Sequence, residues 1–169
     1  RLLLELVNQD LGYDRGPVLR DISVAIAAGD RIALVGESGA GKSTLLAAIR
    51  PLVAHLGLED KLFERAGALS GGQQQRVGVC RALHQGGEIV LGDEPVSAVD
   101  SYQARTVLDA LHEQFDTVVL AMHDVELALQ YASRIIGLKQ GGIVLDQPSA
   151  GLSASDLGFL YRDSNDVGR

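Results

Sequence analysis

The stretch GESGAGKST, at Gly36–Thr44, decides the fold of this chain. Glycines stand at its first, fourth and sixth positions and Lys42 and Ser43 follow, which is the spacing of a phosphate-binding loop. Such a loop leaves a strand and opens a helix, and the apolar segment Arg31–Val35 predicts that strand. Glycines let the backbone turn its N–H groups around phosphate oxygens, and a helix N-terminus adds positive potential there. The sequence therefore predicts a strand–loop–helix unit that binds phosphate groups of a nucleotide.

The side chains of the loop refine this prediction. Lys42 can reach the β- and γ-phosphates of a nucleotide, and the Ser43 hydroxyl can ligate Mg²⁺. The candidate nucleotide-binding residues of the loop are Gly36, Glu37, Ser38, Gly39, Ala40, Gly41, Lys42, Ser43 and Thr44. The alternative interpretation is a glycine-rich surface turn, which the flanking strand and helix patterns argue against.

A second segment, EIVLGDEP at Glu88–Pro95, is an apolar strand that ends in two acids. Successive strand residues point to opposite faces, so adjacent acids at a strand end can serve different roles. We expect Asp93 to hold Mg²⁺ through water, and Glu94 to polarise an attacking water as general base. Taken alone, the pair could be two solvated acids. The phosphate-binding loop in the same chain favours the catalytic interpretation.

A third stretch, LSGGQQQR at Leu69–Arg76, places two glycines where a helix is about to begin, with Ser70 as its N-cap. Glycines at the start of a helix leave N–H groups bare and let another surface approach closely. Such a helix end can bind an anion. Since the chain already has one phosphate-binding loop, we expect this second site to serve a nucleotide held by another copy of the chain.

The rest of the chain alternates apolar strands with helical segments, which predicts an α/β fold with a mainly parallel sheet and antiparallel strands at its margins. The expected strands are Leu2–Val7, Ile22–Ile26, Arg31–Val35, Glu88–Gly92, Thr117–Met122, Arg134–Lys139 and Ile143–Gln147, the last two flanking a QGG hairpin turn. The expected helices are Lys42–Ile49, stopped by Pro51, then Leu69–Leu83, Ser101–Phe115, Asp124–Ala132 and Ser153–Tyr161, the last capped by Ser153 and Asp156.

The composition indicates one folded domain. The chain has 169 residues, a formal net charge of −7 and a single cysteine, Cys80. This length suffices for one core, the charge argues against a nucleic-acid partner, and a lone thiol excludes an internal disulfide. No apolar run approaches the ~18 residues that a membrane helix needs.

Together these motifs resemble those of the ATP-binding cassette (ABC) ATPases, in the family's order and over nearly the whole chain. Walker A corresponds to Gly36–Ser43, the signature motif to Leu69–Gln73, and Walker B to Ile89–Asp93 followed by Glu94. The resemblance implies a single domain over residues 1–169 with the P-loop NTPase fold: a RecA-like core of the ABC type, a mainly parallel sheet and N-terminal antiparallel β strands.

Three further positions match the family's pattern. SAVD at Ser97–Asp100 resembles the D-loop, and His123 in MHD resembles the switch histidine. Tyr13 fits the aromatic residue that stacks on adenine. Read without the resemblance, Tyr13 is equally an edge-strand tyrosine, and His123 a polar residue before a helix.

The resemblance also implies how the site works. Two copies pair head to tail, and the Walker A motif of one and the signature of the other sandwich each ATP, with Mg²⁺ as cofactor. Glu94 and His123 are the implied catalytic residues. The residues implied to act from the partner subunit are Ser70, Gly71, Gly72, Gln73 and Asp100.

The chain departs from the family between the loop helix and the signature. There the family carries several dozen residues, including a glutamine loop and most of a helical subdomain, which is largely missing here. Two explanations are open: the protein lacks this segment, or the sequence omits residues of the natural protein. A missing interior strand would leave backbone groups unpaired, which favours the second. It predicts an interruption near residues 54–58, with neighbouring Cα atoms around His55 much more than ~3.8 Å apart.

The C-terminal half resembles importer cassettes, most closely the phosphonate/phosphate type. This implies a peripheral protein on the cytoplasmic face of the cell (inner) membrane, bound to an integral-membrane transporter subunit and served indirectly by a periplasmic or extracellular binding protein. Two alternatives are a soluble ABC ATPase outside transport and an ATP-binding regulatory module without turnover. The intact Glu94 and His123 argue against the regulatory module, whereas the absent glutamine loop argues for it.

Overall fold

The computed structural model describes residues 1–56, 88–94 and 101–162. Its strands are β1 (Leu2–Tyr13), β2 (Gly16–Ala27), β3 (Arg31–Val35), β4 (Ile89–Asp93), β5 (Thr117–Ala121), β6 (Arg134–Lys139) and β7 (Gly142–Pro148). Its helices are α1 (Lys42–Val53), α3 (Ser101–Gln114) and α4 (Val125–Tyr131), with 3₁₀ segments η1 (Ala54–Leu56) and η3 (Ala154–Tyr161).

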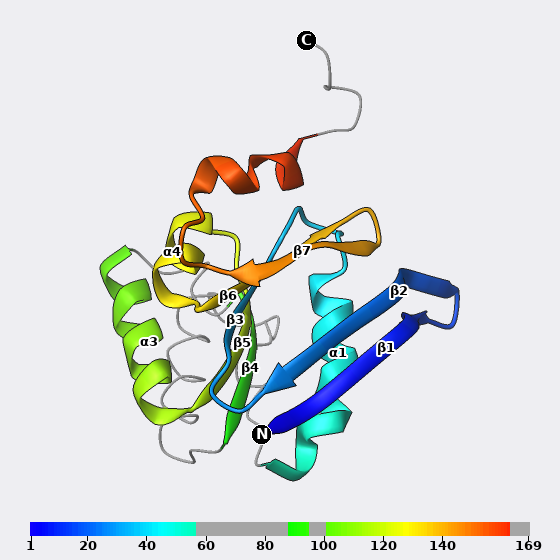
Figure 1. The fold of residues 1–169 in the computed structure, drawn as a ribbon, viewed down its shortest axis with the longest axis horizontal. Helices are drawn as coiled ribbons and strands as arrows, with labels where there is room; N and C mark the ends of the chain where they lie inside the picture. The colour runs from blue at the N-terminus through cyan, green and yellow to red at the C-terminus, as the bar shows by residue number, and fades with distance from the viewer. Residues whose placement is uncertain (57–87, 95–100, 163–169) are drawn as a thin grey trace, which may run out of the picture.

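Five strands form the central sheet in the order β4-β5-β3-β6-β7. The first four are parallel, and β7 pairs antiparallel with β6 at one margin. β1 and β2 form a separate antiparallel sheet. Each of these two strands has 12 residues and is longer than the sequence predicted. Figure 1 shows the central sheet between α3 and α4 on one side and α1 on the other, with the β1–β2 ribbon beside α1. The predicted α/β class, with a mainly parallel sheet, is confirmed.

Both faces of the parallel part of the central sheet are buried, and successive residues of β3, β4 and β5 divide between them. On one face Ala33 and Val35 of β3 pack with α3, α4 and η3. On the other face Ile32 and Leu34 pack with α1, β1 and β2. This two-sided burial explains why the strands read as unbroken apolar runs rather than as alternating ones.

The helix after the loop continues past the proline that was expected to stop it. α1 runs to Val53 and contains Pro51. A proline in a helix removes the hydrogen bond to the carbonyl four residues earlier, here that of Ala47. Ala47 and Pro51 are both exposed, so water can hydrate that carbonyl, while Ile49 and Val53 stay buried on the opposite side. Burial of the apolar face therefore outweighs the local preference of proline.

Local sequence patterns correctly predicted the β6–β7 turn and the capping residues of α4 and η3. The β6–β7 hairpin turns at Gln140 and Gly141, both with positive φ, as QGG predicted. The Asp124 carboxylate accepts a hydrogen bond from the Leu127 N–H at 3.1 Å and caps α4. Asp156 caps the last helix, accepting from the Ser153 N–H at 2.9 Å, although this helix is a 3₁₀ segment.

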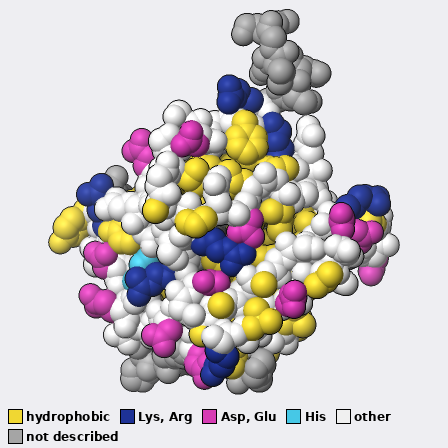
Figure 2. All heavy atoms as spheres, viewed as in Figure 1, with side chains coloured by type: hydrophobic (Ala, Val, Ile, Leu, Met, Phe, Trp, Pro, Cys, Tyr) yellow, Lys and Arg dark blue, Asp and Glu magenta, His cyan; other side chains and the backbone are white. Residues whose placement is uncertain are grey.

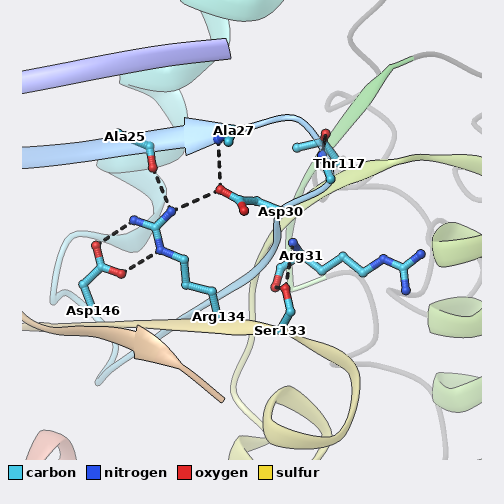
Figure 3. Close-up of polar contacts among 9 residues, drawn as sticks. Ala25, Ala27, Asp30, Arg31, Thr117, Ser133, Arg134 and Asp146 are labelled. Atoms are coloured by element: carbon cyan, nitrogen blue, oxygen red, sulfur yellow. Dashed lines mark hydrogen bonds and ion pairs between the residues drawn. The ribbon is translucent and has the colours of Figure 1, made fainter. Parts of the chain in front are cut away.

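Arg134, the first residue of β6, joins the two sheets (Figure 3). Its guanidinium forms two hydrogen bonds of 2.7 Å with the carboxylate of Asp146 on β7. It also donates to the Ala25 carbonyl at 2.7 Å and to the Asp30 carboxylate at 3.2 Å, and Asp30 in turn accepts from the Ala27 N–H at 2.9 Å. The hydrogen bonds that Arg134 donates to Asp146 raise the pKa of Arg134, so its guanidinium stays protonated throughout the ordinary pH range.

The surface is mixed in charge. Acidic and basic side chains are interspersed with apolar ones on the face in Figure 2, with no large area of one sign. Within the described ranges, no helix has the length and apolarity to cross a membrane.

Two predictions fall on the segment at 57–87. The predicted helix Leu69–Leu83 lies outside the described residues. Of the predicted interruption near residues 54–58, positions 57 and 58 lie outside them too. Up to Leu56 the chain is continuous, because α1 passes directly into η1. The interruption therefore stays a prediction.

Candidate nucleotide-binding site

The site lies where the parallel strands β3, β4 and β5 end. β5 stands between the other two, and its last residue, Ala121, pairs with Leu34 on one side and with Asp93 on the other. The backbone continues this pairing, since the Glu94 N–H donates to the Ala121 carbonyl at 2.8 Å and the Met122 N–H to the Leu34 carbonyl at 3.0 Å. The loop, the acids and the histidine are thus brought to one edge of the sheet, which is where open α/β sheets bind ligands.

The phosphate loop itself has the backbone that its glycines allow. Gly36, Gly39 and Gly41 all have positive φ, at 148°, 83° and 112°. A Cβ on Gly41 would lie 2.3 Å from the Cδ2 atom of the buried Leu19, so glycine there meets both a conformational and a steric need. α1 then begins at Lys42, with Gly41 as its N-cap residue.

Lys42 is a buried cation at the centre of the site. Its side chain is 5% exposed, and its ammonium donates to the Gly36 carbonyl at 2.7 Å and lies 3.8 Å from the Glu94 Oε1 atom. Burial lowers the pKa of Lys42, while the carboxylates of Glu94 and Asp93 act in the opposite direction. The charge of Lys42 is thus held by the protein's own oxygen atoms.

The two acids at the end of β4 contact different side chains. Asp93 Oδ2 accepts a hydrogen bond from the Ser43 hydroxyl at 2.5 Å. Glu94 instead lies 2.7 Å from the Nε2 atom of His123. Glu94 also has a φ of 56°, a left-handed conformation that is uncommon outside glycine. The two neighbouring carboxylates therefore have different partners.

Ser43 and Asp93 offer hard oxygen ligands side by side, which is the donor type that Mg²⁺ prefers. Among the described residues there is no group of three or more His, Cys, Asp or Glu side chains arranged for a metal. A site of two protein oxygens fits Mg²⁺, because this ion keeps several waters and takes further ligands from substrate phosphates.

Tyr13 shares a cavity with Ser43 and Asp93. The cavity is about 220 Å³ and is lined by Tyr13, Ser43, Leu46, Ala47, Arg50, Leu91, Gly92 and Asp93. Tyr13 itself is 63% exposed, at the end of β1. Its ring is therefore free to meet a flat ligand beside the phosphate loop.

The structure brings most of the predicted site residues together. Lys42, Thr44 and Ala40 are buried in or against the loop, whereas Glu37, Ser38 and Gly39 face solvent. The residues predicted to act from a partner subunit lie outside the described ranges: Ser70, Gly71, Gly72, Gln73 and Asp100.

Sequence reasoning missed one residue that contacts the loop. The Gly36 N–H donates a hydrogen bond of 3.1 Å to the hydroxyl of Tyr161, at the end of η3. No local pattern marks a tyrosine so far along the chain as a neighbour of the loop, because only the packing of η3 on the sheet brings the two together.

A buried lysine in a glycine-rich loop, opposite strand-end acids on a parallel sheet, defines a domain of the P-loop NTPase class. Two overlapping stretches of the chain, residues 19–56 and 50–97, match the ABC transporter family. The chain belongs to this family, as an ATP-binding cassette domain.

Among its relatives are proteins called phosphonates import ATP-binding protein PhnC. That of Lactococcus lactis subsp. lactis is 51% identical over 111 residues, which cover 63% of this chain and 45% of that protein. PhnC 1 of Pseudomonas syringae pv. tomato is 42% identical over 156 residues, which cover 86% of this chain and 57% of that protein. The chain thus spans about half the length of these relatives.

Solved structures of the same fold include the dimeric structure of a post-hydrolysis state of an ATP-binding cassette bound to ADP and Pi. Its TM-score is 0.71 at 23% identity, covering 88% of this chain and 99% of the other. A nucleotide-free cassette from an ABC transporter has a TM-score of 0.74 at 16% identity, covering 99% and 98%. These likenesses confirm the fold expected from the motifs.

Proposed function

We propose that this chain is the ATP-hydrolysing domain of a membrane importer of phosphonates or a related phosphorus compound. The observation that carries the proposal is the meeting of Lys42, the Ser43–Asp93 pair and the Glu94–His123 pair at one sheet edge. The family and the PhnC relatives support it.

In this proposal the loop binds the triphosphate. The ammonium of Lys42 turns from Glu94 to the β- and γ-phosphates and keeps its hydrogen bond to the Gly36 carbonyl, so a buried charge gains a stronger partner. Ser43 and Asp93 hold Mg²⁺, which supplies neutralisation of the phosphate charge. The Tyr13 ring stacks on adenine in the cavity that it shares with Ser43.

Hydrolysis needs a base beside the γ-phosphate. Glu94 accepts a proton from the attacking water, and this makes the water oxygen a stronger nucleophile. His123, at 2.7 Å from Glu94, fixes the direction of that carboxylate and reaches toward the γ-phosphate. Glu94 is largely shielded from solvent, with 21% of its side chain exposed, so its charge acts at short range with little screening.

The nucleotide site is completed by a second copy in this proposal. Ser70, Gly71, Gly72 and Gln73 of the partner approach the γ-phosphate, and Asp100 links the two sites. The dimeric cassette with ADP and Pi supports this arrangement through the shared fold. The dimer acts on an integral-membrane subunit from the cytoplasmic face of the cell membrane, and a binding protein outside the membrane delivers the cargo.

Binding and hydrolysis of ATP test the proposal directly. Wild type should bind MgATP and release phosphate, and Lys42→Ala should weaken binding by at least about tenfold, because charge-assisted contacts to phosphate are lost. Arg15→Ala, which removes an exposed cation in the β1–β2 turn, is the matched control and should change nothing. Wild type that does not bind ATP, or equal binding by Lys42→Ala, would refute the proposal.

Coexpression with a candidate membrane subunit separates transport from the alternatives. We expect the two chains to copurify, with hydrolysis that rises when a phosphonate and its binding protein are added. ATP hydrolysis without any such association would favour a soluble ABC ATPase. Binding without hydrolysis in the complex would favour a regulatory module.

We also propose that the natural protein carries further residues near residues 54–58, where the segment 57–87 begins. The match to the family falls into two stretches, which overlap at residues 50–56, and this division supports the proposal. So does the geometry at the ends of the segment, since the Glu88 N–H donates to the Leu56 carbonyl at 3.2 Å. A segment that leaves and returns at adjacent points can lengthen without moving the described core. Peptide mapping across residues 50–60 of the natural protein tests it, and a peptide with the printed sequence would contradict it.

A further inference from the structure

We propose that Tyr161 is a positioning residue of the nucleotide site: its hydroxyl fixes the first glycine of the phosphate loop and thereby the carbonyl that holds Lys42. The proposal rests on ATP binding by the loop, as proposed above. It adds a residue from the C-terminal segment, outside all the motifs of the sequence.

The contact joins parts of the chain that are 125 positions apart. The Gly36 N–H donates to the Tyr161 hydroxyl oxygen at 3.1 Å. Gly36 is buried and Tyr161 is half-buried, so the bond is partly shielded from water. Burial raises the pKa of the Tyr161 phenol and outweighs the hydrogen bond from Gly36, which lowers it, so the hydroxyl stays uncharged at neutral pH.

Gly36 is held on both sides. Its N–H is bound by Tyr161, and its carbonyl accepts the Lys42 ammonium at 2.7 Å. Its φ is +148°, and a Cβ there would lie 2.4 Å from the Leu138 carbonyl oxygen, so the glycine sits tightly against β6. Any movement of Gly36 therefore moves its carbonyl oxygen, and this changes the position of the Lys42 ammonium.

The tyrosine is itself held firmly. Leu157 and Leu160 of η3 are fully buried in the core. Lys139, at the end of β6, donates to the carbonyls of Phe159 at 2.6 Å and Arg162 at 2.8 Å, on either side of the tyrosine. η3 therefore presents the hydroxyl to the loop from a fixed base rather than from a loose tail.

Removing the hydroxyl leaves a buried N–H group without this partner. A neutral hydrogen bond of this kind contributes about 0.5–1.5 kcal/mol, which corresponds to about a 2- to 10-fold change in an equilibrium constant. Because the loop must then be ordered by the nucleotide, the change should appear in ATP affinity.

The test compares Tyr161→Phe with Tyr102→Phe, which removes the same atom from a residue 80% exposed on α3. The measurements on the full chain are the Kd for MgATP by calorimetry, KM and kcat for hydrolysis, and Tm without nucleotide. We expect Tyr161→Phe to raise Kd and KM by about 2- to 10-fold, with kcat at saturating ATP within about twofold of wild type. Tyr102→Phe should match wild type in all of them.

A second variant, Lys139→Met, loosens the support of η3 and should shift Kd in the same direction by a smaller factor. Unchanged Kd in Tyr161→Phe overturns the proposal, and a lower Tm with unchanged Kd does so too, since it assigns the tyrosine to packing alone. If wild type does not bind MgATP, the proposed function is wrong, and the inference about Tyr161 is wrong with it.

Discussion

The Nε2 atom of His123 lies 2.7 Å from the Oε1 atom of Glu94, although one residue follows β5 and the other follows β4. The parallel pairing of these strands, with Asp93 opposite Ala121, places the next residues of each strand side by side. The pair thus depends on strand order and register, and a slip by one residue would separate it.

Glu94→Gln should separate binding from hydrolysis. The amide keeps the size of the side chain but cannot accept a proton from water, so we expect phosphate release to fall by at least about 100-fold. Binding of MgATP should remain, and light scattering should show dimers stabilised by ATP. Glu113→Gln, at an exposed position of α3, is the control and should hydrolyse ATP like wild type. Hydrolysis unchanged in Glu94→Gln would remove the catalytic assignment.

Affinity for ATP should fall at high pH because of Lys42. Burial lowers the pKa of this lysine in the free protein, and only the protonated form attracts phosphate. Bound phosphates favour that form, so affinity falls as pH rises through the lowered pKa, starting below the ~10.5 of an ordinary lysine. Measurement of Kd for MgATP from pH 7 to 10 checks this. Lys42→Arg, which stays charged, should show no such fall, and a parallel fall in that variant would point to another group.

The lowered pKa of Lys42 also determines how the free energy of unfolding changes with pH. The unfolded chain keeps the proton on Lys42 up to about pH 10.5, whereas the folded chain loses it earlier. Between these two values, the contribution of Lys42 to the free energy of unfolding rises with pH; below both, it is constant. Comparing urea unfolding of wild type and Lys42→Met without nucleotide isolates this contribution.

Gly41→Ala should destabilise the protein more than Gly39→Ala. Both glycines have positive φ, but only Gly41 faces a close neighbour, the Cδ2 atom of Leu19 at 2.3 Å from the Cβ position. We expect Gly39→Ala to lower the free energy of unfolding by about 1 kcal/mol through strain, and Gly41→Ala by about 3 kcal/mol through strain and overpacking. Gly142→Ala, which has open space and no positive φ, should change it by under about 0.5 kcal/mol. Equal values for Gly41→Ala and Gly39→Ala in urea unfolding would contradict the steric part.

Arg134→Met should lower stability because it removes the link between the two sheets in Figure 3. The side chains of Arg134 and Asp146 are 22% and 30% exposed, and their hydrogen bonds are charge-assisted, so we expect a loss of about 2–3 kcal/mol. For a chain of this size Tm should fall by about 2–4 °C for each kcal/mol.

A double-mutant cycle with Asp146→Ala should give a coupling energy of at least about 1 kcal/mol. The Arg1–Glu88 pair serves as the control, since its side chains are 62% and 56% exposed and Arg1→Ala should cost under about 0.5 kcal/mol. Additive effects of Arg134→Met and Asp146→Ala would mean that the two side chains do not stabilise each other.

Much of the candidate site could be predicted because its parts are local. The loop, its glycines and Lys42 lie within nine consecutive residues, and Asp93 and Glu94 directly follow an apolar strand. The hairpin at Gln140 and the caps of α4 and η3 were also readable, since each depends on a few neighbouring residues. Short-range chemistry of this kind is carried by the sequence whatever the rest of the chain does.

The sequence by itself therefore determined the class of fold, the phosphate loop and the order of its catalytic candidates. Only the tertiary structure decided the strand order that brings Glu94 to His123, the continuation of α1 past Pro51, and the contact of Tyr161 with Gly36. Each of these depends on which distant surfaces pack together, and that packing is settled by burial over the whole core rather than by any local pattern.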